Sequence, residues 1–166
     1  GDEQHAFEQV AIALKHVAYG ALMGSRPQTL TAMADSPVGL AALLIDHDVK
    51  SYQLIARVFD GKREGLSRDQ ILDNITLYWL TNTAISSARL YWENKLGYID
   101  VKGVALPTAV SAFPDELYQC PKSWAQRAYP NLVYYNKLDR GGHFAAWEQP
   151  ELFAQEMRSG FRAMRP

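Results

Sequence analysis

The sequence has little of what marks several common classes of protein. It contains one cysteine, Cys120, so it can form no internal disulfide and no cysteine-based zinc cluster. This cysteine usage fits a reducing compartment, and we expect a cytoplasmic location. Seventeen basic and eighteen acidic residues give a formal net charge of -1, and no long run of either sign occurs. The sequence therefore lacks the charged surface that nucleic acid or an anionic membrane would bind.

Long hydrophobic runs and metal-ligand clusters are also missing. The longest apolar run, residues 40–45, is far shorter than the roughly 20 residues that a membrane span needs, so we expect no span. His5 and His16 share a helix face, but at about 1.5 Å per residue they lie about 16 Å apart, too far for one metal ion. We expect neither a metal nor a cofactor. His47, which stands between two aspartates, is interpreted as a solvated surface residue.

The sequence contains enough hydrophobic residues to form a buried core. Of its 166 residues, 48% are hydrophobic, which fits one domain or one domain with an appended lid. Up to about residue 97 the patterns are helical. Apolar residues recur every three or four positions over 3–18, and a predicted loop over 20–27 places Tyr19 at a helix end.

Capping residues mark two further helix starts. Ser36 followed by proline at 37 predicts one start, because proline suits the first helical position, where its missing N–H has no partner anyway. Ser67 and Gln70 form a capping box and predict the second. The apolar stretch 38–45 predicts a helix buried nearly all round. The weak helix formers at 81–83 predict a break in the long helix that follows.

The pattern changes near Ile99. Residues 106–113 and 132–138 are predicted strands, with helices predicted over 121–128 and in the last stretch of the chain. The order strand, helix, strand, helix predicts parallel strands. Two parallel strands alone make no stable sheet, so we expect that further strands belong to the complete protein.

Titratable residues follow both predicted strands. Asp115 and Glu116 come just after the first strand, and His143 follows the second in a loop with two glycines. Because carboxyl ends of parallel strands meet at one edge of a sheet, a carboxylate and the histidine should meet there. An acid that precedes the histidine matches the chain order of the α/β-hydrolase triad. Either acid could serve, and the alternative is that these are solvated loop carboxylates.

A nucleophile for such a triad is not visible. An α/β-hydrolase needs a nucleophile in the middle of a G-x-x-x-G elbow between a strand and a helix. The only such strings in the sequence, at 20–24 and 61–65, have Leu22 and Arg63 at their centres. Neither residue is a nucleophile.

Three segments carry a resemblance to a known family. They are AMADSPVGLAALL, NITLYWLTNTAISSARLYWEN and the run from AVSAFPDELYQC to RGGHFAAWEQPELFAQEM. They resemble the C-terminal half of the microsomal-type epoxide hydrolases, α/β-hydrolases with a helical cap. The resemblance runs from about Tyr19 to the last helix.

The resemblance implies a role for four residues. His143, in the family's GGHFAA motif, would activate water, and Glu116, in the FPDEL segment, would be its acid partner. Tyr91, in ARLYWEN, and Tyr19, eight residues before Pro27, would be the tyrosines that hydrogen-bond the epoxide oxygen. The segment GALMGSR departs from the family pattern, so the assignment of Tyr19 rests on fewer matching residues.

The resemblance also implies the fold and the partners. The chain would be α/β, with a helical cap over residues 1–98 and the last two βα units of a parallel sheet over 99–166. The nucleophilic aspartate would come from an N-terminal half or a second chain, and without it the chain should be inactive. The substrate would be a small hydrophobic epoxide. The open sheet also predicts that the isolated chain is no compact monomer and could form a homodimer.

Two alternatives stay open. The chain could be a non-catalytic remnant that binds a hydrophobic ligand or a partner chain through its unfinished sheet edge. It could also come from another α/β-hydrolase, an esterase or a dehalogenase, although the tyrosine pair favours an epoxide hydrolase.

Overall fold

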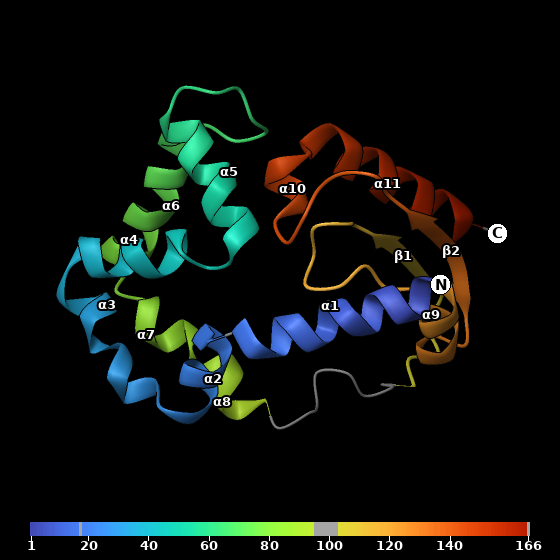
Figure 1. Cartoon of the computed structure of the whole chain (residues 1–166), viewed down its shortest axis with the longest axis horizontal. Helices are drawn as coiled ribbons and strands as arrows, with labels where there is room; N and C mark the ends of the chain where they lie inside the picture. Colours follow the sequence, from blue (N-terminus) through green and yellow to red (C-terminus); the bar gives the residue numbers. More distant parts are fainter. Residues whose placement is uncertain (17, 95–102, 166) are drawn as a thin grey trace. The chain divides into compact units, whose positions relative to one another are not determined.

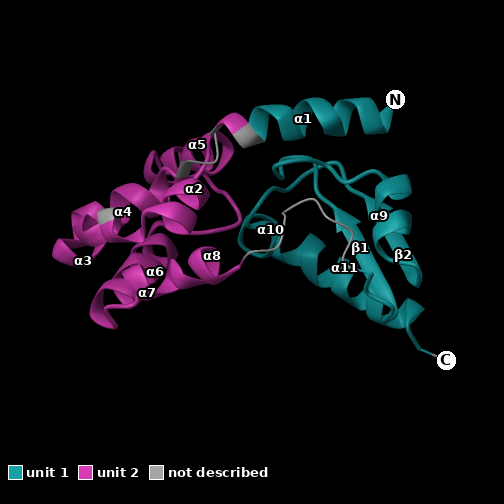
Figure 2. Ribbon diagram, turned by 90° about the horizontal axis from the view of Figure 1, so that it is seen from below, with its two compact units in different colours: residues 1–14, 98–166 teal, residues 15–97 magenta. Residues whose placement is uncertain are grey.

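The computed structural model describes residues 1–16, 18–94 and 103–165. The chain divides into two compact units, which Figure 2 shows in different colours. Unit 1 consists of residues 1–14 and 98–166, and unit 2 consists of residues 15–97.

The division differs from the predicted regions at the N-terminus. The predicted boundary between residues 98 and 99 lies outside the described residues. The first helix, α1 (Asp2–His16), was expected to belong to the helical region, but residues 1–14 group with the C-terminal part of the chain. The first helix groups with the C-terminal part because its side chains contact elements around the sheet, and no pattern within the helix itself reveals these contacts.

The described part of unit 2 is helical (Figure 1). Its helices are α2 (Ala18–Ser25), η1 (Pro27–Thr31), α3 (Ala32–Asp35), α4 (Pro37–Ile45), α5 (Val49–Phe59), α6 (Arg68–Leu80), α7 (Ala84–Ser87) and α8 (Arg89–Glu93). Buried side chains of most of these helices form one core, which includes Met33, Leu40, Ile71 and Ile75. Among the helices that the structure describes, none is long and apolar enough to cross a bilayer.

The predicted helix starts of unit 2 are confirmed. Ser36 Oγ accepts a hydrogen bond of 3.0 Å from the backbone N–H of Gly39 at the start of α4. At the start of α6, the backbone of Ser67 donates to the Gln70 side chain over 2.8 Å, and the Gln70 backbone donates back to Ser67 Oγ over 3.3 Å. The predicted break is confirmed too, because Asn82 has a φ of 50° between α6 and α7.

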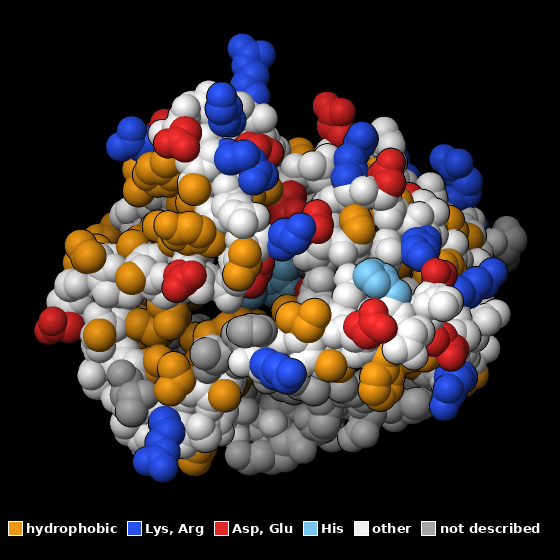
Figure 3. Space-filling model, in the orientation of Figure 1, with side chains coloured by type: hydrophobic (Ala, Val, Ile, Leu, Met, Phe, Trp, Pro, Cys, Tyr) orange, Lys and Arg blue, Asp and Glu red, His pale blue; other side chains and the backbone are white. Residues whose placement is uncertain are grey.

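Two local predictions for unit 2 are wrong. The loop expected over 20–27 is helical up to Ser25, because α2 packs against α8 and gains tertiary contacts that outweigh its two glycines. Helix α4 is not buried all round: Leu40 is 1% exposed but Val38 is 75% exposed. A helix at the edge of a core buries one face only, whatever the composition of the other face. Figure 3 shows hydrophobic side chains on the visible surface of this unit.

Unit 1 contains the strands. Its other elements are β1 (Thr108–Ala112), α9 (Lys122–Ala128), β2 (Leu132–Lys137), α10 (Ala145–Glu148) and α11 (Pro150–Ala163). The predicted order of strand, helix, strand and helix is confirmed, and β1 pairs with β2 in parallel, with Val110 opposite Tyr135. Helix α11 contacts both strands and α9 contacts β2 (Figure 1).

Helix α11 is fixed to the sheet by a buried carboxylate. Glu156 is 8% exposed and accepts hydrogen bonds from Ser111 Oγ of β1 (2.8 Å), and from Tyr134 OH (3.1 Å) and Asn136 Nδ2 (2.9 Å) of β2. Burial and the neighbouring carboxylate raise the pKa of Tyr134, which keeps its hydroxyl protonated as a donor. The three donors tie both strands to one point on the helix.

Helix α1 belongs to unit 1 because its side chains contact the elements around the sheet. Phe7 packs edge-on against Trp124 of α9, with ring centroids 6.4 Å apart. Lys137 Nζ at the end of β2 donates to Asp2 Oδ1 over 3.0 Å. Ala6 is fully buried. These contacts join residues more than one hundred positions apart in the chain, so the first helix completes the C-terminal unit.

Candidate active site

Two loops at the carboxyl end of the sheet lie side by side. One loop follows β1 and the other follows β2. The Asp115 backbone N–H donates to the Gly141 carbonyl over 3.1 Å, and a parallel bridge pairs Asp115 with Gly142. The pairing of the strands thus continues into the loops.

These loops bring Glu116 and His143 together, although 27 positions separate them. His143 Nδ1 lies 2.6 Å from Glu116 Oε1, and the two side chains are 29% and 34% exposed. The Leu117 backbone N–H donates to the same carboxylate oxygen over 2.6 Å. His143 also packs edge-on against the Phe144 ring. With Nδ1–H donated to the carboxylate, the neutral imidazole presents Nε2 as a proton acceptor.

Two glycines allow the close approach in this loop. Gly141 has a φ of 99°, and a Cβ there would lie 2.8 Å from the Phe113 ring. A Cβ on Gly142 would lie 3.0 Å from a Glu148 side-chain oxygen and 3.1 Å from the Asp115 carbonyl. Side chains at these positions would push the histidine loop away from the loop that carries Glu116.

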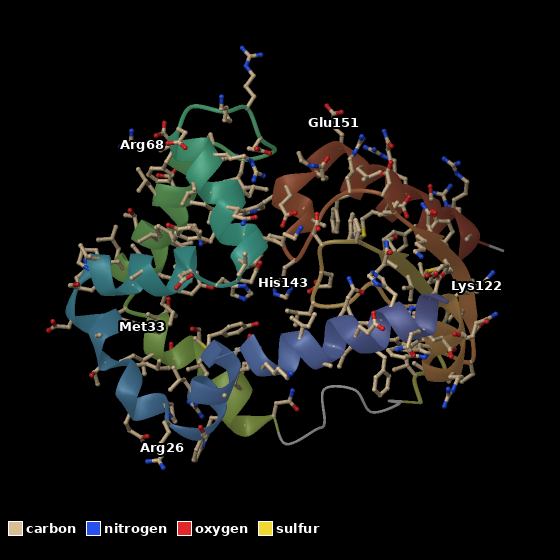
Figure 4. All side chains as sticks on the ribbon, in the orientation of Figure 1. Arg26, Met33, Arg68, Lys122, His143 and Glu151 are labelled. Carbon is tan, nitrogen blue, oxygen red and sulfur yellow. The ribbon has the colours of Figure 1, made fainter. Side chains whose placement is uncertain are left out.

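A second carboxylate holds the backbone on both sides of His143. Glu148 of α10 accepts a hydrogen bond of 2.6 Å from the Gly142 backbone and one of 3.0 Å from the Phe144 backbone. His143 stands between these two donors in the chain. It lies in the loop between β2 and α10, where Figure 4 labels it. Sequence reasoning missed Glu148, since an exposed-looking acid after a histidine gives no pattern of its own.

Gln119 fixes the ends of both strands. Its side-chain amide donates to the Ala112 carbonyl at the end of β1 over 3.0 Å and to the Leu138 carbonyl just after β2 over 2.8 Å. Its backbone N–H donates to Gln9 Oε1 of α1 over 3.0 Å. Sequence reasoning missed this residue as well. The loop that carries Glu116 is therefore anchored a few residues after the acid.

The two predicted tyrosines lie together in unit 2. Tyr19 is in α2 and Tyr91 is in α8, and these helices pack against each other. The two rings meet edge to face, with centroids 5.8 Å apart and an interplanar angle of 87°. Both rings are partly buried against the core of the unit.

The interpretation of His47 as a solvated surface residue is wrong. Its side chain is 15% exposed, and its ring centroid lies 4.3 Å from that of Tyr19. Its Nδ1 lies 2.9 Å from Asp48 Oδ2. The polar sequence around His47 suggested solvent, but the turn between α4 and α5 directs the ring to Tyr19.

In the part of the chain that the structure describes, no three or more His, Cys, Asp or Glu side chains are grouped so that they could hold a metal ion. The histidine–carboxylate pairs are groups for hydrogen bonding and proton transfer.

No protein-family model matches the chain. Over 169 aligned residues it is 47% identical to a "Putative epoxide hydrolase" of Stigmatella aurantiaca, with 99% of this chain and 37% of that protein covered. It is 39% identical to "Epoxide hydrolase 1" of Sus scrofa, with 87% and 34% covered. The chain thus spans little more than a third of the length of these curated relatives.

Solved structures give the same relationship. Juvenile hormone epoxide hydrolase from the silkworm Bombyx mori superposes with a TM-score of 0.73 at 29% identity, covering 93% of this chain and 38% of that one. Aspergillus niger epoxide hydrolase gives a TM-score of 0.72 at 25% identity, with 95% and 40% covered. Over its length the chain is therefore related to the epoxide hydrolases, and its α/β fold is the C-terminal part of the α/β-hydrolase fold, a helical region followed by βα units of a parallel sheet.

Proposed function

We propose that the chain supplies the water-activating half of an epoxide hydrolase, which converts an oxirane to a vicinal diol. The observation that carries the proposal is the 2.6 Å contact between His143 Nδ1 and Glu116 Oε1 at the carboxyl end of the sheet. The relatives named as epoxide hydrolases support the reaction. The substrate would be a small hydrophobic epoxide.

His143 would act as the base in the second of two steps. In the first step, a carboxylate nucleophile opens the epoxide and forms an enzyme ester. In the second, Nε2 of His143 takes a proton from a water molecule, whose oxygen attacks the ester carbonyl. The ester bond to the alcohol oxygen breaks, that oxygen takes up a proton, and the diol leaves while the carboxylate is regenerated. The Glu116 carboxylate stabilises the imidazolium that forms.

Tyr19 and Tyr91 would serve the first step. When an epoxide carbon–oxygen bond breaks, negative charge develops on the oxygen, and phenol hydroxyls can hydrogen-bond and protonate it. The support for this role is the contact of the two rings in unit 2 together with the sequence resemblance. A tyrosine pair serves an epoxide better than an ester, so it favours this function over that of an esterase or dehalogenase.

The nucleophile would come from a segment outside this sequence. Of the two G-x-x-x-G strings, residues 20–24 lie within helix α2 and residues 61–65 follow α5, and neither joins a strand to a helix. We therefore propose that an N-terminal half or a second chain carries the nucleophile and covers the open sheet. A homodimer that pairs exposed edges is the other arrangement that would cover it. The cytoplasmic location stays a prediction.

Complementation tests the proposed function. The 166-residue chain is expressed alone and in the complete polypeptide, and diol formation from an aromatic epoxide such as styrene oxide is followed by chromatography. We expect diol from the complete protein and none above the uncatalysed rate from the chain alone. A complete protein that is folded but hydrolyses esters and no epoxide would overturn the assignment.

A further inference from the structure

A second histidine–carboxylate pair lies in unit 2, outside the groups that the reaction above uses. His47 and Asp48 occupy the turn between α4 and α5. The His47 ring contacts the ring of Tyr19, with centroids 4.3 Å apart and an interplanar angle of 37°. The rings of Tyr19 and Tyr91 in turn meet edge to face, with centroids 5.8 Å apart. The three rings form a continuous chain of contacts, which we call the ring row: His47, Tyr19 and Tyr91.

Asp48 is held in place at the start of α5. As the N-cap of that helix, its Oδ1 accepts the Ser51 backbone N–H over 2.9 Å, and its Oδ2 accepts the Ser51 hydroxyl over 2.6 Å. Burial alone would raise the pKa of Asp48, but hydrogen bonds from His47 and Ser51 outweigh burial and hold the pKa well below its usual range. The carboxylate is therefore ionised and fixed.

The fixed carboxylate orients the His47 ring. Asp48 Oδ2 lies 2.9 Å from His47 Nδ1, so the ionised carboxylate accepts the Nδ1–H and selects the tautomer that carries its hydrogen there. One hydrogen bond at Nδ1 and the contact with Tyr19 together define the ring plane. At 15% exposure the side chain has little room for another rotamer.

The position of the Tyr19 hydroxyl depends on the same contacts. A phenol hydroxyl moves with its ring, so whatever fixes the ring fixes the direction in which the hydroxyl donates. Tyr19 lies near the start of the short helix α2, whose backbone alone leaves the tyrosine rotamer open. Contacts with His47 and Tyr91 restrict that rotamer. Alignment of donor and reacting oxygen governs the rate of a proton-assisted step.

We propose that His47, oriented by Asp48, is a positioning residue that holds the Tyr19 hydroxyl in the direction needed to donate to the epoxide oxygen. This inference rests on the proposed function of Tyr19. It assigns to the ring row a role in ester formation, the first step, and none in ester hydrolysis, the second.

The first arm of the test needs no substrate. In NMR spectra of the complete protein without substrate, the His47 ring protons are compared with those of His5, which is exposed on α1. We expect the His47 ring protons to show ring-current shifts from Tyr19. The Tyr19→Leu substitution should remove these shifts and should leave the His5 signals unchanged. If the chemical shifts of the His47 ring protons do not change in Tyr19→Leu, the contact between the two rings is absent and the proposal is overturned.

The second arm separates the two steps in the complete enzyme. Single-turnover measurements give the rates of ester formation and of ester hydrolysis for His47→Gln, which keeps an amide donor but removes the ring. We expect ester formation to slow about tenfold, with hydrolysis unchanged. His47→Phe, which restores a ring beside Tyr19, should recover part of the loss. His5→Gln is the matched control and should change neither rate.

The remaining outcomes are distinguishable. Asp48→Asn keeps an equally good N-cap but removes the charge, so it should slow ester formation without lowering the thermal unfolding midpoint by more than a few degrees. If the wild-type complete enzyme forms no diol, the proposed function fails. If it is active and His47→Gln forms ester at the wild-type rate, or slows both steps equally, the positioning role fails alone.

Discussion

In unit 2, His47 and Asp48 are neighbours in the sequence, whereas in unit 1, His143 and Glu116 are 27 positions apart. In both pairs Nδ1 of the imidazole binds a carboxylate, at 2.9 Å and 2.6 Å respectively. The first pair needs only the turn that begins α5. The second needs two paired strands and two loops in the correct register, so it depends on the whole of unit 1.

The two pairs also differ in exposure. The side chains of His47 and Asp48 are 15% and 23% exposed, and those of His143 and Glu116 are 29% and 34% exposed. A base that activates water must be reached by water, which suits the more open pair. A group that only holds a neighbouring ring, as proposed for His47, is held in one orientation more firmly when it is less exposed. The same contact therefore fits two different tasks, and the following changes should separate them.

The largest effect is expected from His143→Gln. In the complete enzyme this change removes the group that we propose takes the proton from water, and we expect steady-state diol formation to fall by about 1,000-fold or more. Chromatographic assay of the diol measures it. His5→Gln, which changes an exposed histidine of the same unit, should keep wild-type turnover. Comparable turnover in His143→Gln and His5→Gln would remove His143 from the reaction.

Glu116→Gln should have the next largest effect. The amide can still bond to the imidazole but can no longer stabilise its charged form, so ester hydrolysis should slow about 100-fold or more. The adjacent Asp115→Asn is the matched control, because it neutralises an acid one position away, and its rate should stay within about twofold of wild type. Equal losses in both variants would contradict the assignment of Glu116 as the partner of His143.

Glu148→Ala tests whether the function of the pair in unit 1 needs the anchored backbone of the loop that carries His143. The change leaves the backbone N–H groups of Gly142 and Phe144 without their acceptor, which should lower the free energy of unfolding by about 1–3 kcal/mol. We also expect ester hydrolysis to slow about tenfold, because the imidazole loses its fixed position. Urea denaturation and single-turnover assays measure the two effects.

The control for this prediction is Glu151→Ala. Glu151 is an exposed acid in the first turn of α11, and its removal should cost only a few tenths of a kcal/mol. A Glu148→Ala protein with wild-type stability and wild-type hydrolysis would show that the loop needs no such anchor.

The smallest effect is expected on the pH dependence of stability, and it concerns Asp48 of the pair in unit 2. The pKa of Asp48 in the folded protein lies below its ordinary value of 3.8, so the carboxylate contributes stability above about pH 4 that is lost as the pH falls below it. Asp48→Asn should lack this contribution. The stability difference between wild type and Asp48→Asn, measured by urea denaturation, should therefore shrink between pH 5 and pH 3. A difference that is constant or grows toward pH 3 would contradict it.

Local signals predicted much of this structure. The proline after Ser36 and the capping box of Ser67 and Gln70 each involve residues within three positions, so the sequence contains the whole interaction. The parallel strands could be predicted because a strand, a helix and a strand in succession leave little choice of topology. That topology also placed an acid and His143 at one edge, while the choice of Glu116 over Asp115 came from the family resemblance.

The other features could not be predicted, because they depend on contacts with residues that no local sequence pattern identifies. Gln119 binds two strand ends and Glu148 binds two loop amides, and both look like ordinary surface residues in the sequence. Helix α1 groups with unit 1 through contacts such as Phe7 against Trp124. His47 was misjudged because the identity of its neighbours suggested solvent, whereas its environment is set by the packing of α2 against the turn before α5.

The role of His143 in the second step is tested most directly by the mass of the enzyme itself. The complete protein carrying His143→Gln is mixed with excess epoxide, quenched in acid at increasing times and measured by intact-protein mass spectrometry. We predict that nearly all of the protein gains the mass of one epoxide and keeps it, because the ester forms and is not hydrolysed. Protein that stays unmodified, or an ester that decays at the wild-type rate, would contradict it.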